Sequence, residues 1–255
     1  MTLPQLDDAG RLQLASLLED LPQNTIPLHA LRTGNGRFYA DDAAAAVEPS
    51  LLPRELNGFG PPDRLWRLLR GIPKWDCVLV EREDARELGR VIEAETGVSV
   101  RYFDDVEYTL PGPPLVPHDD RVRVLGPDDL PLLESRFGLV GESADAARLL
   151  LDTGLVAGAF DESGQLVGQA NNHARTDLHA EIGVGTDEAA RGLGLATSAA
   201  SLVASLVMRD GLVPVWSTGE HNAASRRVAE KLGFQEVWRR TFVIPDRPVA
   251  AGAVG

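Results

Sequence analysis

Cysteine is nearly absent from this chain of 255 residues, which has only Cys77 and therefore cannot form an internal disulfide. Because Cys77 begins the apolar run Cys77–Val80, we expect a buried strand thiol rather than a nucleophile. Long apolar runs are also missing, and none reaches the roughly 18 residues of a membrane span. Residues 1–20 carry acids and lack the apolar core of a signal peptide. These absences predict a cytoplasmic protein without a membrane partner.

Basic residues are outnumbered, because 25 Lys and Arg stand against 38 Asp and Glu, giving a net charge of −13. Nucleic-acid binding needs a basic face, so this charge argues against a nucleic-acid partner. It favours a cationic substrate such as an amine, although an acidic surface serves solubility equally well. Aromatic residues make up only 5%, but the hydrophobic content of 44% suffices for a core, and the length allows two domains.

The stretch Arg191–Thr197 holds two glycines at the mouth of a predicted helix. Apolar residues at three- and four-residue spacings predict that helix from Leu195 to about Met208, with Gly211 as its stop. The first N–H groups of a helix lack intrahelical acceptors and carry roughly half a positive charge. Glycines before the helix let the backbone approach a bound anion closely. The stretch therefore predicts a phosphate cradle with Arg191 at its lip.

This cradle fits neither common glycine-rich phosphate loop. A dinucleotide fingerprint requires a third glycine where Thr197 stands, and a Walker loop requires Gly-Lys-Ser/Thr. The stretch resembles instead the pyrophosphate loop of the GCN5-related N-acetyltransferases (GNAT), Arg/Gln-x-x-Gly-x-Gly/Ala. Arg191, Gly194 and Ala196 occupy its three fixed positions. An ordinary helix entry after a strand would also explain these residues.

A second motif follows the cradle, separated from it by a predicted strand at 212–216. Residues 222–234 resemble the later GNAT helix, which opens with Asn-x-x-Ser/Ala and ends in Leu-Gly-Phe. Asn222 is suited to cap this helix and Gly233 to end it, whatever the function. Both motifs, in this order and at this separation, make the chain similar to the GNAT superfamily. The Asn-x-x-Ser pattern with a tandem first half looks most like the zwittermicin-resistance acetyltransferases.

A proline-rich linker at 111–117 divides the order of predicted elements. Before it we predict a helix within 1–20, a strand at 36–40, a loop near 49–53, a helix at 63–69, a strand at 77–80, a helix at 84–95 and a strand at 98–103. After it we predict a strand at 121–125, a helix opening at 127–130, a hairpin of 155–160 and 165–171, the strand 181–186 and final strands at 234–238 and 240–244. The resemblance implies an α/β (α+β) fold: a GNAT domain with a mixed, splayed central sheet in residues 118–255, preceded by a degenerate GNAT-like domain in residues 1–117.

The N-terminal half overlays the C-terminal half without a gap when it is shifted by 136 residues. The matched pairs are Gly58 with Gly194, Gly60 with Ala196, Val80 with Trp216, Ile92 with Val228, Gly97 with Gly233 and Tyr102 with Trp238. In this overlay Glu55 replaces the cradle arginine and Arg86 replaces the capping asparagine. An acid at the lip repels an anion, so we expect the first half to bind no cofactor.

The resemblance implies acetyl-CoA as co-substrate, held between two parallel strands that splay apart, and no metal. The cofactor-binding residues that it implies are Ile182, Gly183, Val184, Arg191, Gly192, Leu193, Gly194, Leu195, Ala196, Thr197 and Asn222. Backbone groups of 182–184 would pair with the pantetheine, and an N–H there would stabilise the oxyanion formed when an amine attacks the thioester.

Two side chains are candidates for proton transfer. Glu181 is the expected base, because acids on this strand serve that role in many relatives; a solvent-facing strand glutamate is the alternative. Relatives carry a tyrosine acid where this chain has Ala229, so Ser225 is the substitute acid, or else a cap or a cofactor ligand. Asn171–His173 on the neighbouring strand order a water or the substrate, or merely pair at an edge.

The resemblance therefore implies an acyltransferase that moves an acetyl group from acetyl-CoA to an amine of a small molecule or peptide by direct attack. A non-catalytic acyl-CoA-binding regulatory module is the alternative, because Ala229 replaces the usual acid and the first half is degenerate. A homodimer is left open.

Overall fold

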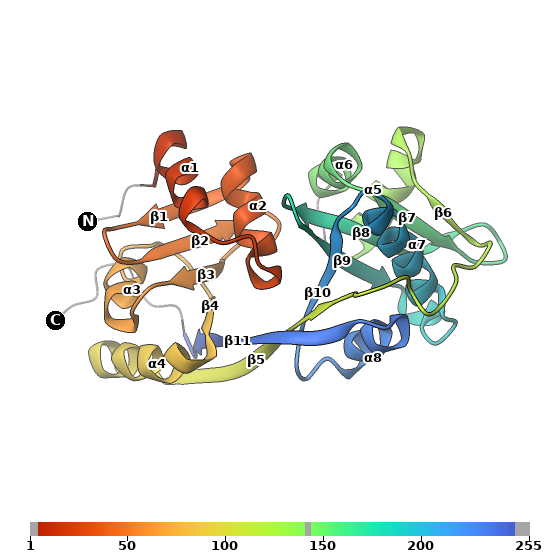
Figure 1. Cartoon of the computed structure of the whole chain (residues 1–255). Helices are drawn as coiled ribbons and strands as arrows, with labels where there is room; N and C mark the ends of the chain where they lie inside the picture. Colours follow the sequence, from red (N-terminus) through yellow and green to blue (C-terminus); the bar gives the residue numbers. More distant parts are fainter. Residues whose placement is uncertain (1–4, 141–143, 248–255) are drawn as a thin grey trace. The chain divides into compact units, whose positions relative to one another are not determined.

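A computed structural model of the chain describes residues 5–140 and 144–247, and it describes no side chains for 137–146 and 153. The chain forms two compact units (Figure 1). Unit 1 comprises the described parts of Met1–Glu19, Ile26–Val106 and Trp238–Gly255, and unit 2 comprises Asp20–Thr25 and Glu107–Val237. The final strand of the chain therefore completes unit 1 rather than unit 2.

Unit 1 is built on strands β1 (Gly36–Ala40), β2 (Ala45–Pro49), β3 (Glu55–Phe59) and β4 (Cys77–Glu81), followed in the sheet by β11 (Gln235–Pro245). Its helices are α1 (Asp8–Leu17), α2 (Thr25–Thr33), α3 (Pro62–Leu69) and α4 (Arg82–Thr96), and β5 (Val100–Thr109) leaves it for unit 2. The pairs β1–β2, β2–β3 and β4–β11 are antiparallel, whereas β3 and β4, joined through α3, are parallel.

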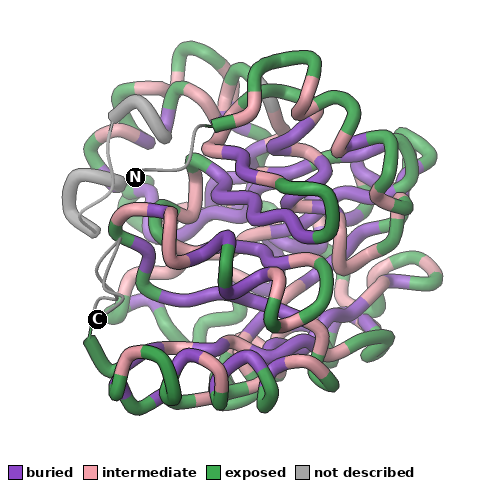
Figure 2. Tube along the Cα trace, turned by 90° about the vertical axis from the view of Figure 1, so that its left-hand side faces the viewer, coloured by how far each residue is buried: buried purple, intermediate pink, exposed green. Residues whose placement is uncertain are grey.

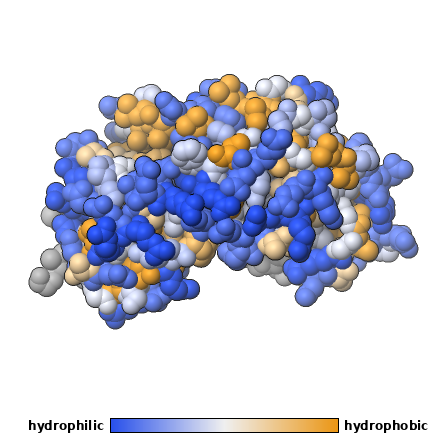
Figure 3. All heavy atoms as spheres, turned by 60° about the horizontal axis from the view of Figure 1, so that its bottom comes forward, coloured by the Kyte–Doolittle hydropathy of each residue, from blue (hydrophilic) through white to orange (hydrophobic). Residues whose placement is uncertain are grey.

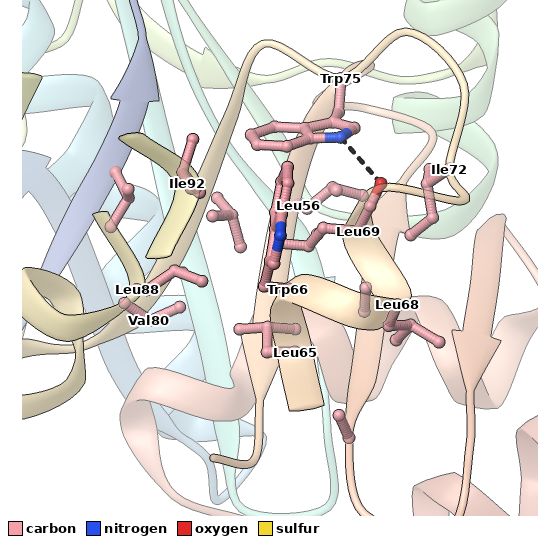
Figure 4. Close-up of a cluster of buried hydrophobic side chains, with 14 of the residues drawn as sticks. Leu56, Leu65, Trp66, Leu68, Leu69, Ile72, Trp75, Val80, Leu88 and Ile92 are labelled. Atoms are coloured by element: carbon pink, nitrogen blue, oxygen red, sulfur yellow. Dashed lines mark hydrogen bonds between the residues drawn. The ribbon is translucent and has the colours of Figure 1, made fainter. Parts of the chain in front are cut away.

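The core of unit 1 is a cluster of aliphatic residues around two buried tryptophans (Figure 4). Trp66 on α3 and Trp75 are each 2% exposed, and the indole N–H of Trp75 donates to the carbonyl of Leu69 at 3.1 Å. The helix α4 contributes Leu88 and Ile92 from one face. Figure 2 shows the same division: buried residues concentrate in the strands, and exposed and buried residues alternate along the helices. The face in Figure 3 is mainly hydrophilic, with hydrophobic residues in separate groups.

Unit 2 contains strands β6 (Val122–Val124), β7 (Val156–Phe160), β8 (Leu166–Arg175), β9 (His179–Thr186) and β10 (Val213–Gly219), in the sheet order β10-β9-β8-β7-β6. Its helices are α5 (Leu130–Val140), α6 (Ala144–Thr153), α7 (Leu195–Arg209) and α8 (Ala223–Leu232), with short 3₁₀ turns η1 (Pro22–Asn24), η2 (Pro127–Asp129) and η3 (Glu188–Ala190). The pairs β6–β7, β7–β8 and β8–β9 are antiparallel, and β9 and β10, joined through α7, are parallel.

The two units thus repeat one topology: two consecutive antiparallel pairs (β1–β2 and β2–β3 in unit 1, β7–β8 and β8–β9 in unit 2) and then a parallel pair connected by a helix. The strand β6 is an additional antiparallel strand of unit 2. The ungapped overlay describes this repeat correctly from β4 onward, where β10, α8 and β11 fall on β4, α4 and β5. It is wrong before α3, because a shift of 136 residues places β9 on β2, whereas β3 is the strand that pairs in parallel. The helix between the parallel strands has 8 residues in unit 1 and 15 in unit 2, and the connections before it also differ in length, so one constant shift cannot serve both sides.

Glu55 therefore does not lie at the lip of a cradle. It belongs to β3 and pairs with Cys77 of β4. Gly58 likewise belongs to β3, and it packs closely there, because a Cβ at Gly58 would lie 2.6 Å from a side-chain carbon of Leu65. Arg86 is no cap either, because α4 begins at Arg82 and the Arg86 guanidinium lies 4.1 Å from the ring centroid of Tyr102.

Most predicted elements are confirmed within a few residues, including α7, α8, the 161–164 hairpin turn and α4 with its left-handed cap Gly97. The sequence analysis did not predict β2, β3, the helix α2 at Thr25–Thr33 or the helix α6 at Ala144–Thr153. The two predicted final strands are one continuous strand, β11. The tail beyond residue 247 lies outside the described residues. Among the described helices, none is both long and apolar enough to cross a membrane.

Cys77 is buried at the start of β4, as predicted. Burial raises the pKa of its thiol to about 12, and the neighbouring carboxylates Glu55 and Asp76 add to the effect. A thiol with so high a pKa is almost wholly protonated at neutral pH and is a poor nucleophile.

Candidate functional site

The strands β9 and β10 separate part-way along their length. Their parallel ladder runs from Val213 opposite His179 to Val215 opposite Glu181. Both strands continue beyond it, β9 to Thr186 and β10 to Gly219. On its other edge β9 stays paired with β8 as far as Thr186. One edge of residues 182–186 therefore faces the opening between the two strands.

The hydrogen bonds at the start of the ladder show which backbone groups face this opening. The N–H of Val213 donates to the carbonyl of Leu178 at 2.8 Å, so that carbonyl faces β10. The N–H of Thr176 donates to the carbonyl of His179 at 2.9 Å, so the next carbonyl faces β8. Backbone groups of successive strand residues point to opposite edges. By this alternation the N–H and C=O of Ile182 and Val184 face the opening, and those of Gly183 face β8. Two donors and two acceptors are thus directed to where a third strand would lie.

Glu181 lies where the two strands part. Its side chain is 2% exposed, and one carboxylate oxygen, Oε1, accepts hydrogen bonds from both the N–H and the Oγ–H of Ser217, each at 2.7 Å. Glu181 therefore is not the solvent-facing glutamate that was the alternative. Its carboxylate links β9 to β10 two residues beyond the last ladder pair.

The predicted cradle leads into α7. Gly192 and Gly194 both have left-handed backbone conformations, with φ of 83° and 78°, and Gly194 is the N-cap of α7. The first helical bond runs from the N–H of Ser198 to the carbonyl of Gly194, which leaves the N–H groups of 195–197 without helical acceptors. A Cβ on Gly194 would meet nothing within 4 Å, so its side is open. Arg191 and the apolar Leu193 are exposed beside it.

The start of α8 carries the other predicted residues. Asn222 is its N-cap and accepts from the N–H of Ser225 at 3.1 Å, and Gly233, with φ of 96°, ends the helix, so both capping predictions are confirmed. The Oγ of Ser225 accepts from the indole N–H of Trp216 on β10 at 3.0 Å. A hydroxyl oxygen that accepts a hydrogen bond can still donate its own proton. Ala229, at the position of the relatives' tyrosine, is fully buried.

A comparison with models of protein families identifies the family that residues 153–240 resemble. Residues 153–240 match the GNAT acetyltransferase model, a span that runs from before β7 through β9, the cradle and α8 into β11. The chain carries a GNAT acetyltransferase domain. This domain is that of an acyltransferase, and acetyl transfer is the activity for which the family is named. No curated protein sequence matches the chain significantly.

Solved structures share the GNAT fold over nearly the whole chain. A GCN5-related N-acetyltransferase-like protein from Streptococcus suis is 24% identical, with 92% of this chain and 98% of that one covered and a TM-score of 0.64. An acetyltransferase of the GNAT family from Colwellia psychrerythraea is 14% identical, with coverage of 97% and 99% and a TM-score of 0.64. A tandem GNAT protein from the clavulanic acid biosynthesis pathway, solved without acetyl-CoA, is 15% identical, with coverage of 95% and 96% and a TM-score of 0.55.

The GNAT domain brings the predicted residues to three places: the open edge of β9, the cradle before α7 and the start of α8. Sequence reasoning missed the partners of these residues. Ser217 holds Glu181, and Arg136 on α5 pairs with Asp187 just before η3 and with Gln169 on β8. Only the glycines and the helix caps could be recognised from neighbouring residues. The missed partners depend on contacts between distant parts of the sequence.

His179 also has a partner that the sequence did not indicate. Its Nδ1 lies 2.9 Å from Oδ1 of Asp20, which also accepts from the Thr176 hydroxyl at 2.7 Å. These bonds fix residues 20–25 to unit 2. Among the described residues, no group of three or more His, Cys, Asp or Glu side chains is arranged to hold a metal ion.

Proposed function

We propose that the protein is an acetyl-CoA-dependent N-acetyltransferase acting on an amine of a small molecule or peptide. The observation that carries this proposal is the open edge of β9 beside the cradle of α7. The extended pantetheine of CoA would pair with Ile182 and Val184 as a strand does, and its pyrophosphate would meet the N–H groups of 195–197. Arg191 and Asn222 would flank the nucleotide and the thiol end, respectively.

The reaction would be direct attack of the amine nitrogen on the thioester carbon. The developing oxyanion would accept from the N–H of Ile182 or Val184. Glu181 would take the proton of the attacking amine, directly or through a water. Both hydrogen bonds from Ser217 go to one of its two carboxylate oxygens, Oε1. The O–H of Ser225 would donate to the leaving thiolate, held in place by Trp216.

We further propose that residues 1–117 are a degenerate GNAT-like domain and residues 118–255 the catalytic one. The reason for a single site differs from the sequence argument. The helix α3, which stands where α7 stands in unit 2, has Pro61 as N-cap, Pro62 next and Asp63 in its first turn. Prolines have no N–H to donate and an aspartate repels phosphate, so this helix start binds no pyrophosphate.

Calorimetric titration with CoA should accordingly give one molecule per chain. The N–H donors proposed to bind the pyrophosphate are present at α7, whereas Pro61 and Pro62 supply none at the start of α3. As a control, Asp63→Asn, in the exposed first turn of α3, removes the repelling charge but should still leave the stoichiometry at one, because Pro61 and Pro62 supply no N–H. Two molecules per chain would contradict the single-site proposal.

Measuring acetyl transfer to amines distinguishes the proposed enzyme from a module that only binds acyl-CoA. We expect acetyl-CoA with a panel of amines, from alkylamines to peptide N-termini, to release CoA and yield an acetylated amine identified by mass spectrometry. A module would bind CoA with the same stoichiometry and acetylate no amine. The acceptor is left to this panel, and the resemblance to zwittermicin-resistance acetyltransferases makes small-molecule amines the first class to try.

A further inference from the structure

The strand β8 contains two consecutive buried asparagines with opposite bonding. Asn172 is 5% exposed, and its side-chain oxygen accepts from the N–H of Leu155. Asn171 is 7% exposed, and its side-chain oxygen has no hydrogen-bond partner. An amide oxygen buried without a donor costs about 1–3 kcal/mol, so a protein that keeps one at such a position invites an explanation in function.

Asn171 lies on the floor of the proposed reaction site. It stands opposite Gly183 in the β8–β9 ladder, and Gly183 is two residues from Glu181, on the same face of β9. A Cβ added to Gly183 would lie 3.4 Å from the side-chain oxygen of Asn171. Because Gly183 has no side chain, no side chain of that residue covers this oxygen, which is itself buried.

A bulge in β8 adds a third group to this floor. The register shifts between Asn172 and Ala174, which makes His173 the extra residue, and bulges of this kind redirect a side chain. The Nδ1 of His173 would lie 3.0 Å from a Cβ on Gly183. Gly183, which has no side chain, is thus bordered by three polar groups: the amide oxygen of Asn171, the imidazole of His173 and the carboxylate of Glu181.

We propose that Asn171 is the binding residue for the acceptor amine. Its oxygen would accept one N–H of a protonated primary amine, with Glu181 supplying the negative charge and His173 the wall. The inference rests on the proposed function, because it takes the β9 opening as the thioester site. A primary amine keeps N–H groups for both Asn171 and Glu181.

Asn171→Leu tests this role, with Asn172→Leu as the matched control. The substitution at Asn171 removes an unpaired buried oxygen with little change of shape, so Tm should rise by about 2–4 °C. Asn172→Leu leaves the N–H of Leu155 without an acceptor, so its Tm should fall. Opposite signs from neighbouring residues would show that Asn171 serves no structural bond.

Binding is measured separately from turnover, by NMR titration of the CoA-saturated protein with butylamine. We expect the Gly183 amide and the Asn171 side-chain NH₂ to shift, and Kd to rise at least about tenfold in Asn171→Leu while the Kd of CoA stays constant. An equal butylamine Kd in this variant, or a Tm lowered as in Asn172→Leu, would overturn the proposal. An absence of turnover with intact butylamine binding would instead count against the proposed enzyme.

Discussion

Gly194→Glu should abolish measurable CoA binding in calorimetry while the protein remains folded. The variant places a carboxylate at the N-cap of α7, beside the N–H groups that are proposed to bind the pyrophosphate and where a Cβ at present meets nothing within 4 Å. The new charge both occupies the space of the pyrophosphate and repels it. We expect a loss of affinity of at least about a hundredfold, since several charge-assisted hydrogen bonds are lost together.

Gly211→Glu is the matched control for this experiment. Gly211 has φ of 80°, close to the 78° of Gly194, and a Cβ there also meets nothing within 4 Å. Both substitutions therefore carry the same backbone strain, about 1–2 kcal/mol, but Gly211 lies at the opposite end of α7. CoA affinity should survive at Gly211, and an equal loss in both variants would show that strain, not the cradle, is responsible.

Glu181→Gln should lower kcat by about a hundredfold or more at neutral pH with CoA affinity nearly unchanged. The amide oxygen of glutamine can still accept from the N–H and hydroxyl of Ser217, so the link between β9 and β10 is preserved while the base is removed. Raising the pH should recover part of the rate, because the amine then arrives deprotonated.

Glu181→Ala provides the comparison, since it removes both the base and the link to Ser217. It should lower CoA affinity and Tm as well as kcat. If Glu181→Gln keeps the wild-type rate and pH profile while Glu181→Ala loses CoA binding, the carboxylate has only the structural role of fixing the point where the strands part.

The parts of the site that the sequence predicted are those encoded by neighbouring residues. A helix needs an N-cap such as Asn222 and an end such as Gly233, and the glycines before α7 adopt left-handed angles that other residues avoid. These requirements act over a few positions, so they can be recognised without knowing the fold. The family resemblance rested on the same short stretches.

The parts that could not be predicted depend on residues far apart in the sequence. Ser217 meets Glu181 only because β9 and β10 pair in parallel, and Arg136 meets Asp187 across 51 positions. The strands β2 and β3 were not predicted because prolines and a glycine interrupt this short segment, and such residues usually indicate a loop. In the structure, β3 is nevertheless a strand, because it pairs with β4. The overlay wrongly matched Glu55 with Arg191 because a constant shift assumes that the segments between the parallel strands have equal length in both halves, whereas Glu55 lies in β3.

The place of β11 in unit 1 gives the chain an unusual order of completion during synthesis. The edge of β4 is covered by Arg240–Val243, and Val243 is fully buried in the core around Trp66. A ribosome therefore finishes the first-made unit last, after every residue of the GNAT domain up to Val237 has emerged. Until then β4 presents an unpaired edge, the kind of surface that chaperones cover and that aggregates form from. A nascent chain stalled before residue 238 would leave unit 1, not the site-bearing unit, incomplete.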